Sequence, residues 1–338
     1  MAGGGIEGRA ATVGESAAGT TVGLVLPTFP QSGRLDADLL RATVADADAL
    51  GVDALWACDH LFWHGPVLEA LTTLAVAAGT GTGCTLGTAV LQLALRDPAV
   101  VAKAVASLQE LSGGRLVLGV GAGAHEGEFA AAGADFARRG ATLDAALDEL
   151  ARLWAPGDER YAQRPAPERV PIWVGGSGDP AVRRAARRGD GWIPMFLSPD
   201  ALRSRYRQLD AEIVLAGRQP ADVTRSVLLF VRTGPDGAVA RRQGLAWMSS
   251  LYGLPEARLD RHLVAGEPAA CVERLAAYAE AGAEHLCLFV ADDDPVPHID
   301  ALLAGLRVAT ARSSTDQSST VTAPSTATPA STARTVHP

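Results

Sequence analysis

Short apolar runs alternate with longer segments of helical periodicity along most of the chain. The runs are rich in β-branched residues and lack a polar face, which is typical of strands buried on both sides of a parallel sheet. We predict eight strands from them, at 22–27, 53–59, 84–91, 116–121, 171–175, 191–195, 226–232 and 285–290.

The segments between these strands carry helix start and stop signals. Asp36 and Asp97 stand where N-caps are expected, Pro98 occupies a first helical position, and Gly51 follows the end of a helix. The predicted helices span 36–50, 66–78, 98–111, 143–154, 179–189, 200–216, 268–281 and 296–307, with further helical material after the 226–232 strand, up to residue 251.

This alternation predicts an α/β protein with a single (β/α)8 TIM barrel and inserted loops near 122–142 and 247–262. A doubly wound open sheet is the alternative, because periodicity alone does not show closure. We expect the barrel to span 21–310. Residues 1–20 are Gly- and Ala-rich and are expected to be linker-like or disordered, and the Ser/Thr-rich residues 311–338 are expected to form a disordered tail.

The composition narrows the classes of partner. Acidic residues outnumber basic ones, 38 to 30, and the formal net charge is −8, so binding to nucleic acid or to a membrane surface is not expected. No apolar stretch is long enough to span a membrane, and the N-terminus lacks the pattern of a secretory signal, so we expect a soluble, cytoplasmic protein. The cysteines form no CxxC pair, which favours buried free thiols and no metal site; they are Cys58, Cys84, Cys271 and Cys287.

Candidate chemistry is sought where the strands end, because active sites of such barrels lie at the carboxyl ends of the strands. Asp59 and His60 follow the second strand, and there a carboxylate could orient an imidazole for proton transfer. In the alternative interpretation Asp59 caps a loop and His60 only lines the pocket.

Glycines mark the third and fourth strands. Gly87 indicates a bulge, the close approach of a ligand, or simple packing. The alternating glycines in 119–123 would remove side chains where a flat ring could lie, although they do not complete a dinucleotide-binding fingerprint. His125 and Glu126 follow on a loop that belongs either to the site or to the solvated surface.

Residues 175–178 read Gly-Gly-Ser-Gly and lead from a strand into a helix that begins at Asp179. Backbone N–H groups at such a junction can face a phosphate, and the helix dipole favours negative charge there. A basic stripe follows, of which at least two members are expected to be ordinary surface residues; it comprises Arg183, Arg184, Arg187 and Arg188. The P-loop lysine, HExxH and GxSxG signatures are missing from the sequence, which disfavours NTPases, zinc proteases and α/β-hydrolases.

Taken together, these segments resemble the bacterial luciferase-like superfamily of flavin- and deazaflavin-dependent oxidoreductases. The resemblance extends from about residue 22 to 307, and the segments that carry it are 55–61, 86–98, 111–129, 138–144 and 171–192. It is strongest toward members that use coenzyme F420, an 8-hydroxy-5-deazaflavin.

The resemblance implies a luciferase-like barrel that transfers a hydride between C5 of coenzyme F420 and a small organic substrate. The first alternative is an FMN-dependent monooxygenase that uses dioxygen, and the second is a non-catalytic cofactor-binding or partner subunit. The family also implies a homodimer.

The resemblance assigns roles to individual residues. It implies a non-prolyl cis peptide at Ala89-Val90 that backs the cofactor ring, and a catalytic pair of Asp59 and His60 facing the ring or substrate, with His60 as acid or base. The remaining cofactor contacts would come from Cys58, Ala122, Gly175, Gly176, Ser177 and Gly178, and the substrate pocket from Trp63, His125 and Glu126. Ala124 stands where sugar-phosphate dehydrogenases of the superfamily carry a catalytic glutamate, which argues against glucose 6-phosphate as the substrate.

Overall fold

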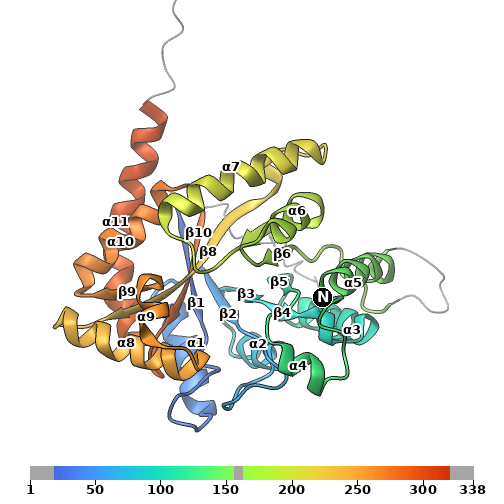
Figure 1. Cartoon of the computed structure of the whole chain (residues 1–338), viewed down its shortest axis with the longest axis horizontal. Coiled ribbons are helices and arrows are strands. Elements are labelled where there is room, and N and C mark those ends of the chain that lie inside the picture. Colours follow the sequence, from blue (N-terminus) through green and yellow to red (C-terminus); the bar gives the residue numbers. More distant parts are fainter. Residues whose placement is uncertain (1–18, 156–162, 320–338) are drawn as a thin grey trace, which may run out of the picture.

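The computed structural model describes residues 19–155 and 163–319. Within these residues, eight strands pair in parallel, each with the next, and the last pairs with the first (Figure 1). In ring order they are β1 (Thr21–Val25), β2 (Ala54–Ala57), β3 (Thr85–Thr88), β5 (Leu116–Gly121), β6 (Ile172–Gly175), β7 (Gly191–Ile193), β8 (Thr224–Thr233) and β10 (His285–Val290). The closed ring confirms the (β/α)8 barrel and excludes the open sheet.

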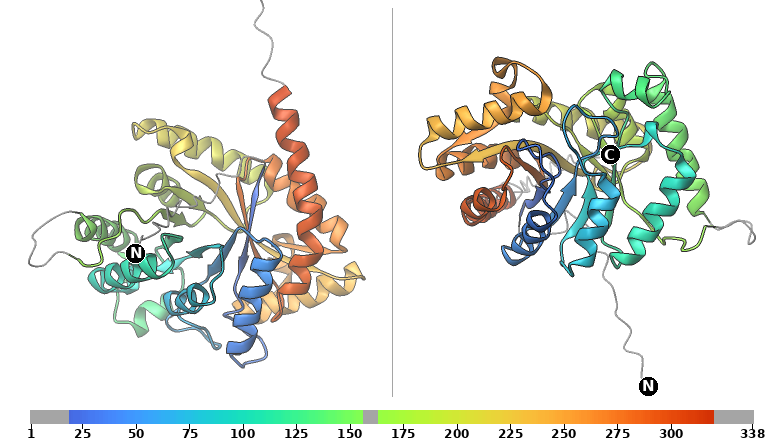
Figure 2. Two further views of the ribbon diagram at one scale, coloured as in Figure 1. Left: turned by 180° about the vertical axis from the view of Figure 1, so that it is seen from behind. Right: turned by 90° about the horizontal axis from the view of Figure 1, so that it is seen from below.

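Helices surround the barrel on its outer side (Figure 2). They are α1 (Ala37–Ala49), α2 (Ala70–Gly79), α3 (Pro98–Leu111), α4 (Glu126–Ala131), α5 (Arg139–Trp154), α6 (Asp179–Arg188), α7 (Pro199–Leu215), α8 (Gly237–Tyr252), α9 (Glu256–Leu259), α10 (Pro268–Glu280) and α11 (Val296–Ser319). The two predicted N-caps are confirmed, because the carboxylates of Asp36 and Asp97 each accept two backbone N–H bonds from the first turn of α1 and α3.

Two short strands and two short α-helices were not predicted. β4 (Leu91–Gln92) pairs with β5 beyond a break in the predicted 84–91 strand, and β9 (Leu263–Gly266) pairs with the end of β8 outside the ring. The helices α4 and α9 lie in the segments predicted as loops. Elements of two to six residues are too short to show a periodic pattern.

The last helix also differs from expectation. α11 continues to Ser319, past the predicted end at residue 307 and into the predicted disordered tail. Once the packed part of a helix has formed, each further residue adds a hydrogen bond at little cost, so composition alone placed its end too early. The expectations for 1–18 and 320–338 lie outside the described residues.

Two indole rings fill the interior of the barrel against glycines. A Cβ at Gly87 would lie 2.3 Å from the ring of Trp56, and one at Gly191 would lie 2.5 Å from the ring of Trp173. Gly87 therefore serves packing, which decides between the alternatives left open by the sequence.

Buried His285 lies beside these rings. Trp56 Nε1 donates to His285 Nε2 at 3.0 Å, and His285 Nδ1 lies 2.8 Å from the Thr21 hydroxyl. Because indole only donates, His285 is held neutral with its proton on Nδ1. Burial lowers its pKa to about 3.

All four cysteines are buried and free, as predicted. Among the described residues, no group of three or more His, Cys, Asp or Glu side chains could hold a metal ion. No helix in that part of the chain combines the length and apolar character needed to cross a membrane.

Candidate functional site

His60, just after β2, forms an ion-pair-like contact with Glu128 on α4. His60 Nδ1 lies 2.7 Å from Glu128 Oε2, and the Glu128 side chain is fully buried. The other carboxylate oxygen accepts the backbone N–H groups of Leu61 at 2.9 Å and Phe62 at 3.1 Å. Gln92 Nε2 approaches both oxygens, at 3.2 and 3.3 Å. Glu128 is thus surrounded by donors, as an ionised carboxylate requires.

This arrangement sets the tautomer of His60. A carboxylate that accepts from every other neighbour also accepts from the imidazole, so the proton of neutral His60 lies on Nδ1 and Nε2 keeps a free lone pair. Burial lowers the pKa of His60, and the hydrogen bond to Glu128 opposes that shift without cancelling it. Burial alone would raise the pKa of Glu128, but hydrogen bonds from Phe62 and His60 outweigh this effect and hold the Glu128 pKa below its ordinary value.

Contrary to expectation, Asp59 does not face the mouth of the barrel. Its carboxylate is fully buried and forms a two-pronged pair with Arg96, at 2.7 Å for each contact, and it accepts the backbone N–H of Gln92 at 2.8 Å. Burial raises the pKa of Asp59, and the Arg96 charge opposes this. The predicted catalytic pair is therefore corrected: Asp59 holds Gln92 and Arg96 in place, and Glu128 is the carboxylate at His60.

Trp63 lies over His60 in an aromatic cluster. The two ring centroids are 3.9 Å apart, and His64 and His125 lie 4.6 and 5.5 Å from the Trp63 ring. His125 also caps α4, where its Nδ1 accepts the N–H of Glu128. The structure thus brings Trp63 and His125 together beside His60, and their role in a substrate pocket stays a prediction.

The other predicted pocket residues differ in placement. Glu126 is exposed on the first turn of α4 and makes no hydrogen bond to the described part of the chain, so it does not contact His60. Ala122 is half-buried after β5. Cys58 is buried inside the barrel, and burial raises its pKa to about 12, so it is a neutral thiol.

The predicted non-prolyl cis peptide at Ala89-Val90 is present. A Cβ at Gly121 would lie 2.6 Å from a Val90 methyl, one at Gly175 would lie 2.9 Å from both methyls, and one at Gly119 would lie 1.9 Å from the Thr88 carbonyl oxygen. These glycines make room for the break between β3 and β4. This corrects the expectation that the glycines of β5 lie against a flat ring, and it gives Gly175 a packing role.

Residues 176–178 form a turn at the start of α6. Gly176 has a φ of +101°, and Gly178 is the N-cap without a side-chain cap. Ser177 directs its hydroxyl to the backbone of Met195, donating to the carbonyl oxygen at 2.6 Å. The described residues provide no acceptor for the N–H groups of Ser177, Gly178 and Asp179. Unpaired N–H groups at a helix start are the donor set that a phosphate takes, so the turn fits a cofactor phosphate through its backbone rather than through the Ser177 hydroxyl.

Two of the four arginines in the basic stripe on α6 pair with acidic residues of α5. Arg184 is buried and pairs with Asp144 of α5 at 2.7 Å, and Arg188 pairs with Asp148 one turn further on. Arg183 and Arg187 are exposed. Half of the stripe therefore joins α6 to α5 and is not available to a ligand.

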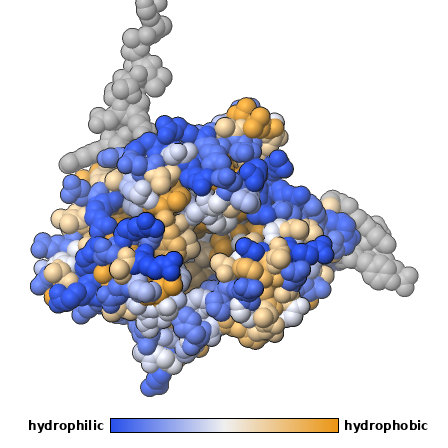
Figure 3. Space-filling model, viewed as in Figure 1, coloured by the Kyte–Doolittle hydropathy of each residue, from blue (hydrophilic) through white to orange (hydrophobic). Residues whose placement is uncertain are grey.

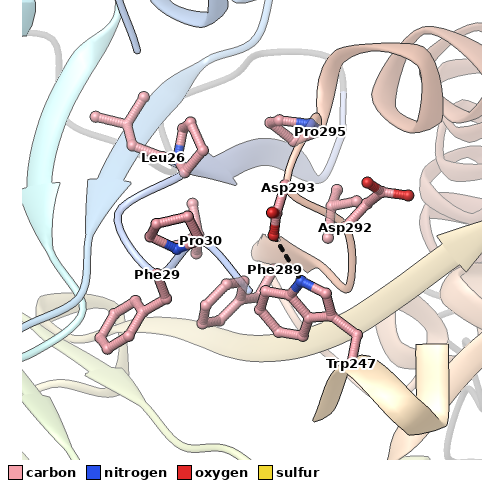
Figure 4. Close-up of a pocket in the computed structure, with 11 residues that line it drawn as sticks. Leu26, Phe29, Pro30, Trp247, Phe289, Asp292, Asp293 and Pro295 are labelled. Atoms are coloured by element: carbon pink, nitrogen blue, oxygen red, sulfur yellow. Dashed lines mark hydrogen bonds between the residues drawn. The ribbon is translucent and has the colours of Figure 1, made fainter. Parts of the chain in front are cut away.

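The loop after β1 is held at the rim by Asp293. The Asp293 carboxylate accepts the backbone N–H groups of Gln31 at 2.8 Å and Ser32 at 2.9 Å, and the indole N–H of Trp247 at 3.1 Å (Figure 4). The pocket in Figure 4 is lined in part by Phe29, Trp247 and Phe289. A second pocket lies beside Phe29, Trp63 and His64. The face shown in Figure 3 is hollowed near its centre, where apolar and polar surfaces meet.

Glu128 and Gln92 are the site residues that the sequence did not assign. Glu128 lies 68 residues from His60, so only the fold reveals that the two meet. The available signal was its place three residues after His125, on the buried side of a helix that was expected to be a loop.

Known proteins are similar to this chain over most of its length. The family model described as luciferase-like monooxygenase matches residues 20–285. An F420-dependent glucose-6-phosphate dehydrogenase of Beutenbergia cavernae is 32% identical over 298 residues, covering 74% of this chain and 86% of that protein. A protein of the same description from Intrasporangium calvum is 28% identical and covers 77% and 92%, respectively.

Solved structures, two of which follow, share the fold. An F420-dependent secondary alcohol dehydrogenase, in complex with an F420-acetone adduct, has a TM-score of 0.72 at 17% identity and covers 85% of this chain and 99% of its own. The oxygenating constituent of 3,6-diketocamphane monooxygenase from Pseudomonas putida, in complex with FMN, has a TM-score of 0.68 at 19% identity and covers 87% and 98%.

Proposed function

We propose that this chain, which belongs to the luciferase-like monooxygenase family, is a coenzyme F420-dependent oxidoreductase acting on a small organic substrate. The proposal is supported by relatives named as F420-dependent enzymes over most of its length. The observation that carries it is His60: a partly buried imidazole at the barrel mouth whose Nδ1 is bonded to a buried carboxylate and whose Nε2 has no hydrogen-bond partner in the described part of the chain.

The residues present fit the cofactor. The backbone N–H groups of residues 177–179 would hold its phosphate, and Val90, with its methyl groups in the space left by Gly121 and Gly175, would back the ring. When bound, the deazaflavin supplies two-electron hydride transfer and the protein supplies binding, orientation and proton handling.

His60 handles the proton in this proposal. Its depressed pKa keeps it neutral at pH 7, and a neutral imidazole with a free Nε2 accepts the proton of a substrate hydroxyl. In the reverse direction the protonated ring returns it to a carbonyl oxygen. Glu128 orients the ring through Nδ1 and stabilises the imidazolium form, so it is a positioning residue.

An FMN-dependent monooxygenase is the second candidate. The phosphate turn does not discriminate between the two cofactors, since each carries a phosphate, and the barrel also resembles an FMN-containing enzyme. The homodimer and the cytoplasmic location stay predictions.

Titration of the purified protein with coenzyme F420 and with FMN separates the candidates. We expect low concentrations of the protein to quench the fluorescence of coenzyme F420, and we expect FMN to bind more weakly. Tight FMN binding without F420 binding would favour the monooxygenase, and binding of neither would favour a non-catalytic subunit.

A further inference from the structure

Five aromatic rings contact one another in a closed circuit near His60. The centroid distances are 6.3 Å for Phe29–Trp63, 6.4 Å for Trp63–Tyr252, 5.8 Å for Tyr252–Phe230, 4.9 Å for Phe230–Phe289 and 6.2 Å for Phe289–Phe29. We call these five residues the aromatic collar. They come from the loops after β1 and β2, from the end of α8, and from β8 and β10; Figure 4 shows Phe29 and Phe289 from one side.

His60 belongs to the same wall. Its ring centroid is 3.9 Å from that of Trp63 and 5.8 Å from that of Phe29. Trp63 and Tyr252 are only half-buried, so this part of the collar is accessible to a ligand, whereas Phe29, Phe230 and Phe289 are buried. A molecule whose oxygen meets His60 Nε2 would therefore have the rings of Trp63 and Tyr252 available to the rest of its body.

Phe196 extends this surface from the end of β7. It has a φ of +61°, a left-handed conformation in which a bulky residue is rare unless its surroundings hold it there. Its ring stacks on Phe230 at 5.9 Å and 15°, and lies 5.7 Å from Tyr252. Such backbone outliers concentrate at ligand clamps, which makes Phe196 a residue that shapes the pocket.

The charges near the collar do not fit an anionic substrate. Arg232, two residues after Phe230, pairs with Asp292 at 2.6 Å, and Arg96 pairs with Asp59. The single lysine of the chain, Lys103, lies on α3 and donates to the Arg164 carbonyl. His60 is neutral at pH 7 because of its lowered pKa. Burying an anion beside apolar rings without a paired cation is unfavourable.

One arginine provides a test of the opposite view. Arg261 is exposed, and its Nε donates to His262 Nε2 at 3.0 Å, while the His262 ring lies 4.8 Å from that of Phe196. If the substrate were a phosphorylated sugar, Arg261 is the cation in this group that would be free to receive it.

We propose that the substrate is an uncharged secondary alcohol or ketone with an apolar, ring-bearing body, an inference that rests on the oxidoreductase function proposed above. In the oxidising direction the alcohol gives up its C–H hydrogen with both electrons to the oxidised cofactor, and its O–H proton passes to His60 Nε2. A C=O bond forms, and the cofactor is reduced by two electrons. The half-buried rings of the collar, Trp63 and Tyr252, together with Phe196, hold the apolar body.

The test begins with binding, which requires no turnover. Calorimetry with acetophenone and with glucose 6-phosphate is run on the protein loaded with whichever of F420 or FMN it binds. We expect acetophenone to bind at least tenfold more tightly than glucose 6-phosphate, and Phe196→Ala to weaken acetophenone at least tenfold. Leu215→Ala, which removes an exposed apolar side chain at the end of α7, is the matched control and should change nothing.

Turnover then separates the two proposals. With F420 bound, 1-phenylethanol should have a kcat/KM at least tenfold above that of 2-propanol, and Phe196→Ala should reduce this ratio. Preferred binding or turnover of glucose 6-phosphate, weakened by Arg261→Ala, would overturn the substrate class and leave the F420 function intact. Binding of acetophenone to an FMN-loaded protein that ignores F420 would overturn the function and leave the substrate class intact.

Discussion

Replacing Glu128 with Gln tests the role of the carboxylate that lies against His60. In wild type, one carboxylate oxygen accepts the N–H groups of Leu61 and Phe62, and the other lies 2.7 Å from His60 Nδ1. In Glu128→Gln the amide oxygen stays with the two N–H donors, because an NH₂ there would face only donors. The new NH₂ group then points at His60 Nδ1 and makes it an acceptor, which moves the neutral imidazole's proton to Nε2.

The magnitude follows from what is lost. A hydrogen bond to a charged group contributes about 1.5–3 kcal/mol, so its loss should lower the pKa of His60 by roughly one to two units. With a proton on Nε2 the ring no longer accepts one from the substrate, and general base catalysis is typically worth about 10²–10⁴-fold. We expect kcat for alcohol oxidation to fall about 100-fold while cofactor affinity stays within a factor of two or so.

The assay is the pH profile of kcat, together with the ¹⁵N shifts of the His60 ring. Wild-type oxidation should decline only as the pH falls through a His60 pKa below its ordinary 6.5, because protonation removes the base. The remaining activity of Glu128→Gln should decline at still lower pH. Glu126→Gln removes the same charge from the same helix without touching His60 and is the control. A variant with wild-type kcat and an unprotonated Nε2 would refute the reasoning.

Three further predictions follow from the packing. Gly176→Ala should weaken cofactor binding at least tenfold, about 1.4 kcal/mol, because Gly176 has a φ of +101°. Gly217→Ala, at a φ of +75° in open space, should carry similar strain without changing cofactor affinity. Titration with the cofactor checks both variants. Gly121→Ala should destabilise the fold by about 1–3 kcal/mol, because the new methyl group meets Val90. Adding Val90→Ala to the same chain should restore much of the lost stability, which urea unfolding measures. Equal stability of the single and double variants would contradict the contact. The pKa of His285 is lowered to about 3 in the folded protein, so the unfolded chain takes up the proton first as the pH falls. Stability is therefore lost from pH 6.5 toward 3, by about 1.6 kcal/mol between pH 6.5 and 5. His285→Gln should lose less over that range, and an equal loss would show that other groups carry it.

The fold was readable from the sequence because both faces of each barrel strand are buried. Runs such as that of β5 are apolar throughout, and Asp97 followed by Pro98 marks the start of a helix without ambiguity. The strands β4 and β9 escaped because they are short and depend on partners far along the chain.

The site was readable only where chemistry and position coincide in one short segment. His60 and the turn at residues 176–178 follow strands directly, so barrel geometry places them at the mouth. The partner of His60 was wrong, because Asp59 is its neighbour in sequence, whereas Glu128 meets it only after folding. Gly121 and Gly175 were misread in the same way, since Val90, which explains them, lies on another strand connection.

The most direct test of the proposed function measures hydride transfer with and without oxygen. Oxidised coenzyme F420, the protein and 1-phenylethanol are mixed under anaerobic conditions, and cofactor absorbance and acetophenone are followed together. The F420 proposal predicts one acetophenone formed per cofactor reduced, with no need for oxygen and with the rate abolished in His60→Ala. A reaction that proceeds only with FMN and dioxygen would contradict it.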